Sequence, residues 1–250
     1  MNLFAKLEAR ASKNNPICVG IVGVGKFGSM FLAQAIKLPG IHIVAICDLD
    51  INRAQSNLAY VGWQQERYAA NSIDNAVKYG TTFLTDNWQD IIDCALINII
   101  IECTGNPVVA VEHAVAAFDA KKHFINATVE ADAFCGPGLA IAASDAGVIY
   151  SMAFGDQPAL VCDLVDWARS CGFIVAAAGR GHLWQPRYRF STPETVWNYW
   201  GLTEEQAARG RLNPKMFNSF LDGSKPAIES AAIANATGLH VPKNGLAYPP

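Results

Sequence analysis

The sequence predicts an α/β fold in which a doubly wound parallel sheet is followed by a second α/β unit. Short runs rich in Val and Ile alternate with longer amphipathic segments, and several of these runs are continuously apolar. Such strands are buried on both faces, which is typical of a parallel sheet covered by helices. The first run ends in Gly23, Gly25 and Gly28, and the second ends in Asp48.

The predicted elements of the first domain follow in a regular order after a short amphipathic helix within residues 1–15. The charges of that helix are mixed among its apolar residues, unlike a signal peptide. Strands are expected at residues 16–25, 41–48, 81–85, 96–105 and 123–132. Helices are expected at residues 26–38, from about 51, 73–79, 87–94 and 106–122. We therefore predict a Rossmann-type domain over residues 1–132.

A second domain, residues 133–250, is expected to bind the substrate. Its pattern predicts helices at 136–147 and 157–172 and strands at 148–156 and 173–182. A further short helix is expected at 225–237, where Ser224 has the character of an N-cap, Pro226 fits the first turn and Gly238 stops the helix. The run of alanines in this helix favours close packing on a neighbouring element.

Composition excludes several classes of function. The net charge of −3 gives no basic surface for nucleic acid. The apolar runs are far shorter than the roughly 20 residues of a spanning helix, so we expect no membrane segment. The seven cysteines are scattered and odd in number, which argues against disulfides and a zinc site. A reduced cytoplasm is the expected compartment, and a small molecule the expected partner.

The three glycines form a G-x-G-x-x-G motif between a strand and a helix. Glycine there permits a tight turn, close approach of a pyrophosphate and close helix packing. Cys103, Thr104 and Gly105 end the fourth strand and are expected beside the nicotinamide, with Cys103 serving as a small buried residue rather than in redox chemistry. The complete predicted cofactor set is Gly23, Val24, Gly25, Lys26, Phe27, Gly28, Asp48, Arg53, Cys103, Thr104 and Gly105.

The residues leave the choice of dinucleotide open. Asp48, at the end of the second strand, favours the ribose diol of NAD, whereas Arg53 could meet the 2′-phosphate of NADP.

An arginine-rich segment in the second domain suggests a place for a substrate anion. Arg180, His182, Arg187 and Arg189 precede Ser191 and Glu194, which have the spacing of a capping box. A helix end of this kind can hold a phosphate, although an ordinary capped helix explains the same residues. The predicted substrate residues are Arg180, His182, Ser191 and Asn218.

The segment 217–230 offers the catalytic candidates Asp222, Lys225 and Glu229. Lys225 and Glu229 are one turn apart, so an exposed ion pair is the simpler interpretation. In the functional interpretation they lie at the mouth of the cofactor crevice, where Lys225 polarises a carbonyl or developing alkoxide. Glu229 would then bind a metal or move a proton.

A divalent metal site is a further hypothesis. Glu130 and Asp132 are expected at the end of the fifth strand, where residues two apart project to one side. Together with Glu229 they could bind Mg²⁺ or Mn²⁺, which prefer oxygen ligands. Acids at a strand end often only bond to the following helix, which is the alternative.

Several stretches resemble a known family: "GIVGVGKFGSMFLAQ", "NATVEADAFCGPGLA", "YSMAFGDQPAL" and "NPKMFNSFLDGSKPAIESAAIANATGL". They are similar to homoserine-dehydrogenase-like proteins, and most of all to 1-deoxy-D-xylulose 5-phosphate reductoisomerase-like enzymes. The resemblance implies an NADPH-dependent isomerisation and reduction to 2-C-methyl-D-erythritol 4-phosphate, in isoprenoid synthesis, and is compatible with a divalent metal, Mg²⁺ or Mn²⁺. Members of the family are longer, so we expect a truncated chain with an incomplete substrate domain that self-associates.

The leading expectation is thus an NADP-dependent oxidoreductase, with NAD as the alternative cofactor. Hydride would pass to a carbonyl held between the two predicted domains. The alternatives are a homoserine-dehydrogenase-like reductase of another small carbonyl compound, and a nucleotide-sensing protein that performs no chemistry.

Overall fold

A computed structural model describes residues 2–182 and 184–246. The chain divides into two compact units, Met1–Phe154 and Gly155–Pro250, which we describe separately. No helix in the described part of the chain is long and apolar enough to cross a bilayer.

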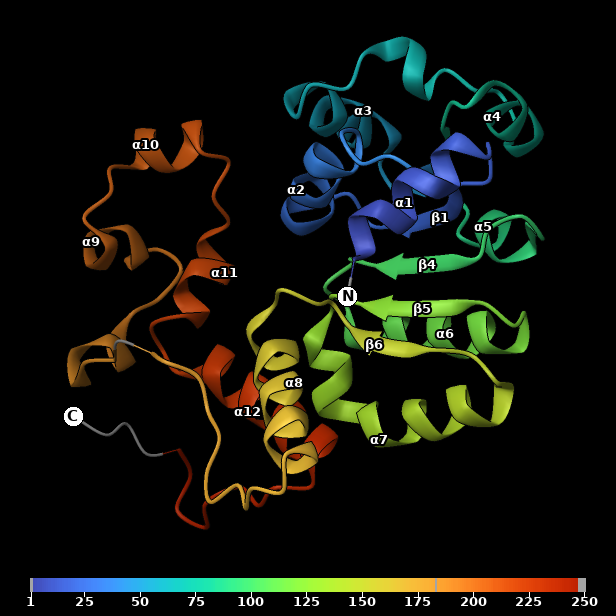
Figure 1. Ribbon diagram of the computed structural model, residues 1–250. Helices are drawn as coiled ribbons and strands as arrows, with labels where there is room; N and C mark the ends of the chain where they lie inside the picture. The colour runs from blue at the N-terminus through green and yellow to red at the C-terminus, as the bar shows by residue number, and fades with distance from the viewer. Residues whose placement is uncertain (1, 183, 247–250) are drawn as a thin grey trace. The chain divides into compact units, whose positions relative to one another are not determined.

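The first unit is built on a six-stranded parallel sheet with the strand order β3-β2-β1-β4-β5-β6 (Figure 1). The strands are β1 (Ile17–Val22), β2 (Ile41–Cys47), β3 (Phe83–Thr85), β4 (Ile99–Glu102), β5 (His123–Asn126) and β6 (Tyr150–Met152). The helical elements are α1 (Leu3–Ser12), α2 (Lys26–Ala35), α3 (Ile51–Tyr60), η1 (Gln65–Tyr68), α4 (Ile73–Tyr79), α5 (Gln89–Asp93), α6 (Pro107–Asp119) and α7 (Val129–Ala146). The predicted doubly wound fold is confirmed.

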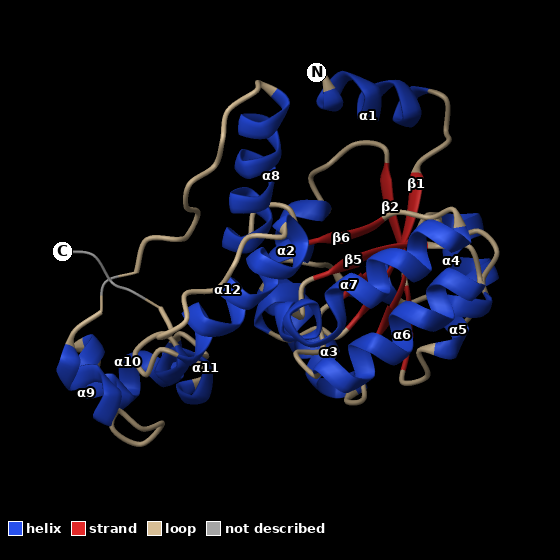
Figure 2. Ribbon diagram, turned by 90° about the horizontal axis from the view of Figure 1, so that it is seen from below, coloured by secondary structure: helices blue, strands red, loops and turns tan. Residues whose placement is uncertain are grey.

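Helices cover both faces of this sheet (Figure 2). One apolar core includes Leu32 of α2 and Leu58 of α3, and the other includes Phe118 of α6 and Leu139 of α7. The central strands β1, β2 and β4 are mostly Val and Ile because they contribute side chains to both cores. Strand order reverses between β1 and β4, and the crevice at such a switch point is where open α/β sheets bind their ligands.

The boundary predicted after residue 132 is replaced by one after Phe154. β6 pairs in parallel with β5, and α7 packs on α6 and β6. The helix and strand that we had placed at the start of a second domain therefore complete the first sheet. The fifth strand is also shorter than predicted, because it ends at Asn126 and α7 begins at Val129.

The second unit is helical in its described residues. It contains α8 (Gln157–Ser170), η2 (Pro186–Phe190), α9 (Val196–Trp200), α10 (Glu204–Arg209), α11 (Pro214–Ser219) and α12 (Ser224–Thr237). α8 and α12 pack side by side (Figure 1). The face of α12 that includes Pro226, Glu229, Ala232 and Ile233 is buried, as its small residues suggested.

The strand predicted at 173–182 is wrong, and so is the description of this unit as α/β. These ten residues carry no regular secondary structure. An isolated strand is not stable without a partner, and the described part of the second unit offers none.

Candidate functional site

The glycine turn lies where β1 meets α2, and each of its glycines has a separate role. Gly23 has a φ of +92°, and a Cβ there would lie 2.8 Å from the backbone of Cys103. A Cβ on Gly28 would lie 2.4 Å from the carbonyl oxygen of Gly23. A Cβ on Gly25 would meet nothing within 4 Å.

Gly25 is also the N-cap of α2, and no side chain caps that helix start. Protein backbone therefore packs against Gly23 and Gly28, whereas the space beside Gly25 is empty. Backbone N–H groups at such a helix start favour an anion, and the arrangement fits a dinucleotide pyrophosphate. Lys26 and Phe27 lie exposed in the first turn, whereas the side chain of Val24 is in the core.

Asp48 fastens this turn to the end of β2. Its Oδ2 accepts a hydrogen bond from the Val24 N–H at 2.9 Å, and its Oδ1 accepts from the Asp50 N–H at 3.0 Å. Arg53 Nη2 lies 2.6 Å from the same Oδ1. The carboxylate side chain is only 2% exposed, whereas that of Arg53 is 58% exposed. A guanidinium rather than a carboxylate therefore faces solvent at the carboxyl end of β2.

The loop after β4 is held by a buried carboxylate that the sequence did not single out. Glu102 is fully buried, and its Oε2 lies 2.6 Å from His113 Nδ1. Its Oε1 accepts from the Thr104 N–H at 2.7 Å, and Thr128 Oγ1 accepts from the Gly105 N–H at 2.9 Å. The predicted nicotinamide-side loop is thus tied to α6 and to the end of β5.

A signal for this role was present, since Glu102 is a charged residue at the end of an otherwise apolar strand. Buried charges are normally paired, so a charge at this position predicts a polar partner nearby, which the structure shows to be His113 of α6. Burial, followed by the charge of Glu102, raises the pKa of the Cys103 thiol well above its usual range. Cys103 is accordingly a thiol, in agreement with the role of a small packing residue.

In the second unit, Glu229 forms ion pairs with two of the predicted site residues, Arg180 and Lys225. Its carboxylate on α12 is 3% exposed, and its Oε2 lies 2.8 Å from Arg180 Nε. Lys225 Nζ lies 3.9 Å from Oε1, one helical turn away. The predicted pair of Lys225 and Glu229 is confirmed, but it is not an exposed surface pair, because the acid is buried and carries a second cation.

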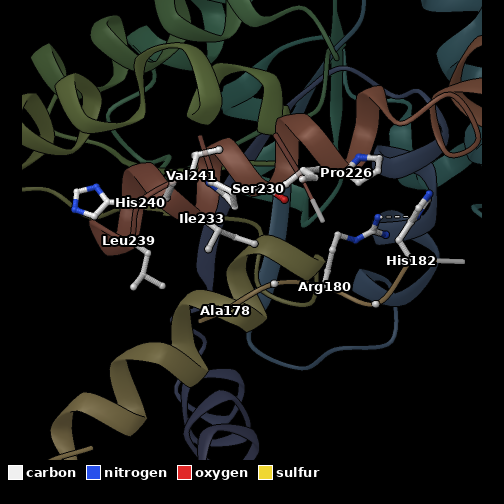
Figure 3. A pocket seen from close by; sticks show the side chains of 14 residues that line it. Ala178, Arg180, His182, Pro226, Ser230, Ile233, Leu239, His240 and Val241 are labelled. Atoms are coloured by element: carbon white, nitrogen blue, oxygen red, sulfur yellow. Dashed lines mark hydrogen bonds between the residues drawn. The ribbon is translucent and has the colours of Figure 1, made fainter. Parts of the chain in front are cut away.

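A cavity of about 310 Å³ lies beside this cluster, between residues 178–182, α12 and residues 239–246 (Figure 3). Arg180 and His182 lie at one end of it, and Leu239 and His240 at the other. Arg180 Nη1 donates to His182 Nδ1 at 3.3 Å, so that this ring nitrogen is the acceptor. Burial, and then the charge of Arg180, lower the pKa of His182.

Asp222, the third catalytic candidate, is exposed and shapes a turn. Its Oδ1 accepts from the Ser224 N–H and hydroxyl at 2.9 and 2.7 Å, and Asn218 Nδ2 donates to its Oδ2 at 3.0 Å. The two residues thus connect α11 to α12. The N-cap of α12 is Gly223, with φ +91°, rather than the predicted Ser224.

The capping box predicted for Ser191 and Glu194 is not formed. Residues 192–195 make a turn in which the Thr192 N–H donates to Thr195 Oγ1, and α9 begins only at Val196. A capping box does occur at Thr203 and Gln206. Ser191 is buried, and its hydroxyl has no hydrogen-bond partner in the described part of the chain.

The metal hypothesis loses its geometric basis. Glu130 and Asp132 lie on α7, not on a strand, and residues two apart on a helix do not share a face. The Asp132 carboxylate accepts from Asn126 Nδ2 at 2.7 Å and from the Tyr150 hydroxyl at 2.6 Å. Within residues 2–182 and 184–246, no three His, Cys, Asp or Glu side chains form a group that could hold a metal ion.

Comparison with known proteins agrees with the two-part organisation. Residues 155–250 match the family described as "Oxidoreductase DRL, catalytic domain". The second unit is therefore similar to the catalytic domain of an oxidoreductase family. The inositol 2-dehydrogenases of Salmonella paratyphi B and Salmonella typhimurium are 30% identical to this chain over 127 residues, which are 50% of this chain and 30% of those proteins. The chain thus spans about a third of the length of these curated relatives.

Solved oxidoreductases show partial similarity. The oxidoreductase YvaA of Bacillus subtilis is 21% identical, with a TM-score of 0.44 over 62% of this chain and 39% of that chain. A homoserine dehydrogenase of Thiobacillus denitrificans is 20% identical, with a TM-score of 0.47 over 62% and 34%. The sequence matches are thus to oxidoreductases, and the doubly wound sheet with its glycine turn has the geometry that such proteins use to bind a dinucleotide.

Proposed function

We propose that this chain supplies the cofactor-binding and catalytic parts of an NADP-dependent oxidoreductase that reduces the carbonyl group of a small anionic substrate. The glycine turn carries the proposal, since Gly23 and Gly28 admit no side chain while Gly25 opens onto free space at an uncapped helix start. A bound nicotinamide supplies the hydride chemistry, and Thr104 and Gly105 would line its side of the site.

NADP is the proposed cofactor because of the pair formed by Asp48 and Arg53. Asp48 is buried and already accepts two backbone hydrogen bonds, so a ribose diol would have to displace Arg53 to reach it. Arg53 is exposed and can turn toward a 2′-phosphate. NAD remains the alternative, in which Arg53 moves away and Asp48 accepts from the ribose.

Lys225 and Glu229 are the proposed catalytic groups. Lys225 Nζ would donate a hydrogen bond or a proton to the carbonyl oxygen as negative charge develops there. Glu229 would position Lys225, whereas Asp222 holds the turn that starts α12. A divalent metal at Glu229 stays part of the wider hypothesis, but Asp132 is engaged elsewhere.

The substrate is proposed from resemblance. 1-Deoxy-D-xylulose 5-phosphate is the first candidate, which would place the protein in isoprenoid synthesis as a reductoisomerase-like enzyme. The inositol 2-dehydrogenases suggest inositol as one alternative, and the resemblance to homoserine-dehydrogenase-like proteins suggests aspartate semialdehyde as another. We further propose a cytoplasmic, homo-oligomeric protein.

A substrate panel tests the proposal. The chain is assayed with NADPH and NADH against 1-deoxy-D-xylulose 5-phosphate and aspartate semialdehyde, and with the oxidised cofactors against myo-inositol. Lys225→Met and Glu229→Gln should lower kcat at least a hundredfold with the dissociation constant for NADPH unchanged. A protein that binds NADPH but is inert to the whole panel would instead support the nucleotide-sensing alternative.

A further inference from the structure

The side chain of Arg180 is unusually well fixed for an arginine in an irregular segment. Its Nε contacts Glu229 Oε2 at 2.8 Å and also donates to Gln157 Oε1 of α8, and its Nη1 donates to His182. Three residues from three parts of the second unit therefore hold one guanidinium, whose side chain is 12% exposed. A guanidinium fixed in advance loses little conformational entropy when it binds a ligand.

The outer edge of this guanidinium remains available. Arg180 Nη2 donates to no atom in the described part of the chain, and Arg180 lines the cavity. An arginine has five N–H donors and no acceptor, and its planar edge matches a carboxylate or a phosphate. Gly179 and Gly181 flank it, and a Cβ on either would meet nothing within 4 Å, so a ligand can approach the backbone closely.

The charges around this edge favour an anion. Arg180 and Lys225 both contact the carboxylate of Glu229, and these three groups together carry one net positive charge. His182 adds no charge while its Nδ1 accepts from Arg180, and the lowered pKa of this histidine agrees with the neutral ring. A partly buried net charge attracts a counter-ion more strongly than an exposed one.

The rest of the cavity is mostly apolar. Ile233 of α12, Leu239 and Val241 form what we call the apolar wall, and the hydroxyl of Ser230 lies between it and Arg180 (Figure 3). The volume of about 310 Å³ is at the small end of ligand pockets. The cavity therefore fits a molecule with one charged end and a short carbon body.

We propose that this cavity is a binding site for a small organic anion, whose phosphate or carboxylate group lies on Arg180 and whose carbon chain lies along the apolar wall. That the anion is the substrate's charged end rests on the function proposed above. The test therefore measures binding separately from turnover.

Calorimetric titration of the 250-residue chain, without cofactor, uses inorganic phosphate, butyl phosphate and pentanoate as probes. Burial of two methylene groups at about 0.8 kcal/mol each should make butyl phosphate bind more than tenfold tighter than inorganic phosphate. Whichever of butyl phosphate and pentanoate has the lower dissociation constant identifies the preferred charged group. Equal affinity for inorganic and butyl phosphate would exclude the apolar wall, and no binding of any probe would exclude the site.

Two variants assign the binding to this cavity. Arg180→Met should abolish binding of butyl phosphate, and the matched control Arg189→Met, an exposed arginine outside the cavity lining, should not. Because Arg180→Met leaves Glu229 buried with one cation fewer, Ala234→Leu provides a second test. It fills the cavity without touching a charge and should weaken butyl phosphate at least tenfold, with the circular dichroism unchanged.

Undiminished binding of butyl phosphate by Ala234→Leu would overturn the proposal. Turnover with an unchanged KM in that variant would likewise overturn it, while leaving the oxidoreductase function intact. A chain that binds butyl phosphate through Arg180 but is inert with every substrate would refute the proposed function and leave the anion site standing.

Discussion

Replacement of Asp132 by asparagine should make the first unit more stable, and by more at high pH than at low pH. Burial is the main influence on this carboxyl group and raises its pKa from 3.8 to about 6, against the opposing hydrogen bonds from Tyr150 and Asn126. An acid with a raised pKa in the folded state binds more protons there than in the unfolded chain. The folded state therefore loses stability as the pH rises from about 4 to about 6.

The size of the effect follows from the shift. A difference of about 2 pKa units corresponds to about 3 kcal/mol of destabilisation once Asp132 is fully ionised, of which about half is already present at pH 5. Asparagine resembles the protonated acid, because its oxygen can accept from Asn126 Nδ2 while its amide donates to the Tyr150 oxygen. The advantage of the variant should thus grow by about 1.5 kcal/mol between pH 5 and pH 8.

Urea unfolding at several pH values, followed by tryptophan fluorescence, to which Trp63 and Trp88 contribute from the first unit, measures this advantage. The difference between variant and wild type cancels the other titrating groups, and Glu112→Gln, an exposed acid on α6, controls for the loss of a carboxyl group. A variant that is less stable than the wild type at pH 8, or a difference that does not change with pH, would refute the assignment of a raised pKa to Asp132.

Three further predictions address the cofactor and the second unit. Arg53→Ala should weaken binding of NADPH about tenfold or more, as expected for loss of a charge-assisted pair, and should not weaken binding of NADH. Equal losses for the two dinucleotides in fluorescence titration would contradict the assignment of Arg53 to the 2′-phosphate. Gly28→Ala should abolish dinucleotide binding, because its Cβ would lie 2.4 Å from the Gly23 carbonyl oxygen, whereas Ala33→Gly on the same helix should retain it. Gel filtration should show self-association through the exposed apolar residues Leu160, Leu164 and Trp167 of α8. Leu164→Lys should then elute later than the wild type, as a monomer. Identical elution of the variant and the wild type would argue against this surface.

The sequence predicted the first unit well, because its strands are continuous apolar runs and its glycine motif sits at a strand end. The predicted places of Gly23 and Gly28 are confirmed by the backbone contacts that forbid a side chain there. The start of α7 was missed, because alternating polar and apolar residues at 126–132 are typical of a strand. The side-chain bonds of Asn126 and Asp132, which help to begin the helix there, are not visible in a local pattern.

The second unit was predicted less well for a related reason. The apolar residues at 173–178 are typical of a buried strand, but strand formation depends on a partner that no local window reveals. The spacing of Lys225 and Glu229 gave their pairing correctly. The approach of Arg180 to the same carboxylate is a long-range contact, so the burial of Glu229 and the cavity beside it became visible only in the folded chain.

The close approach of Gly23 to the backbone of Cys103 joins the two ends of the proposed cofactor site into one rigid unit. A Cα that packs against a peptide group leaves neither segment room to shift alone, and the bonds of Glu102 carry the same restraint on to α6 and β5. A larger side chain at position 103 should then weaken affinity for ADP-ribose, a fragment that lacks the nicotinamide. A substitution that changes how the adenosine half is bound would thus also change how the nicotinamide ring is aligned, so the two properties would be difficult to redesign separately.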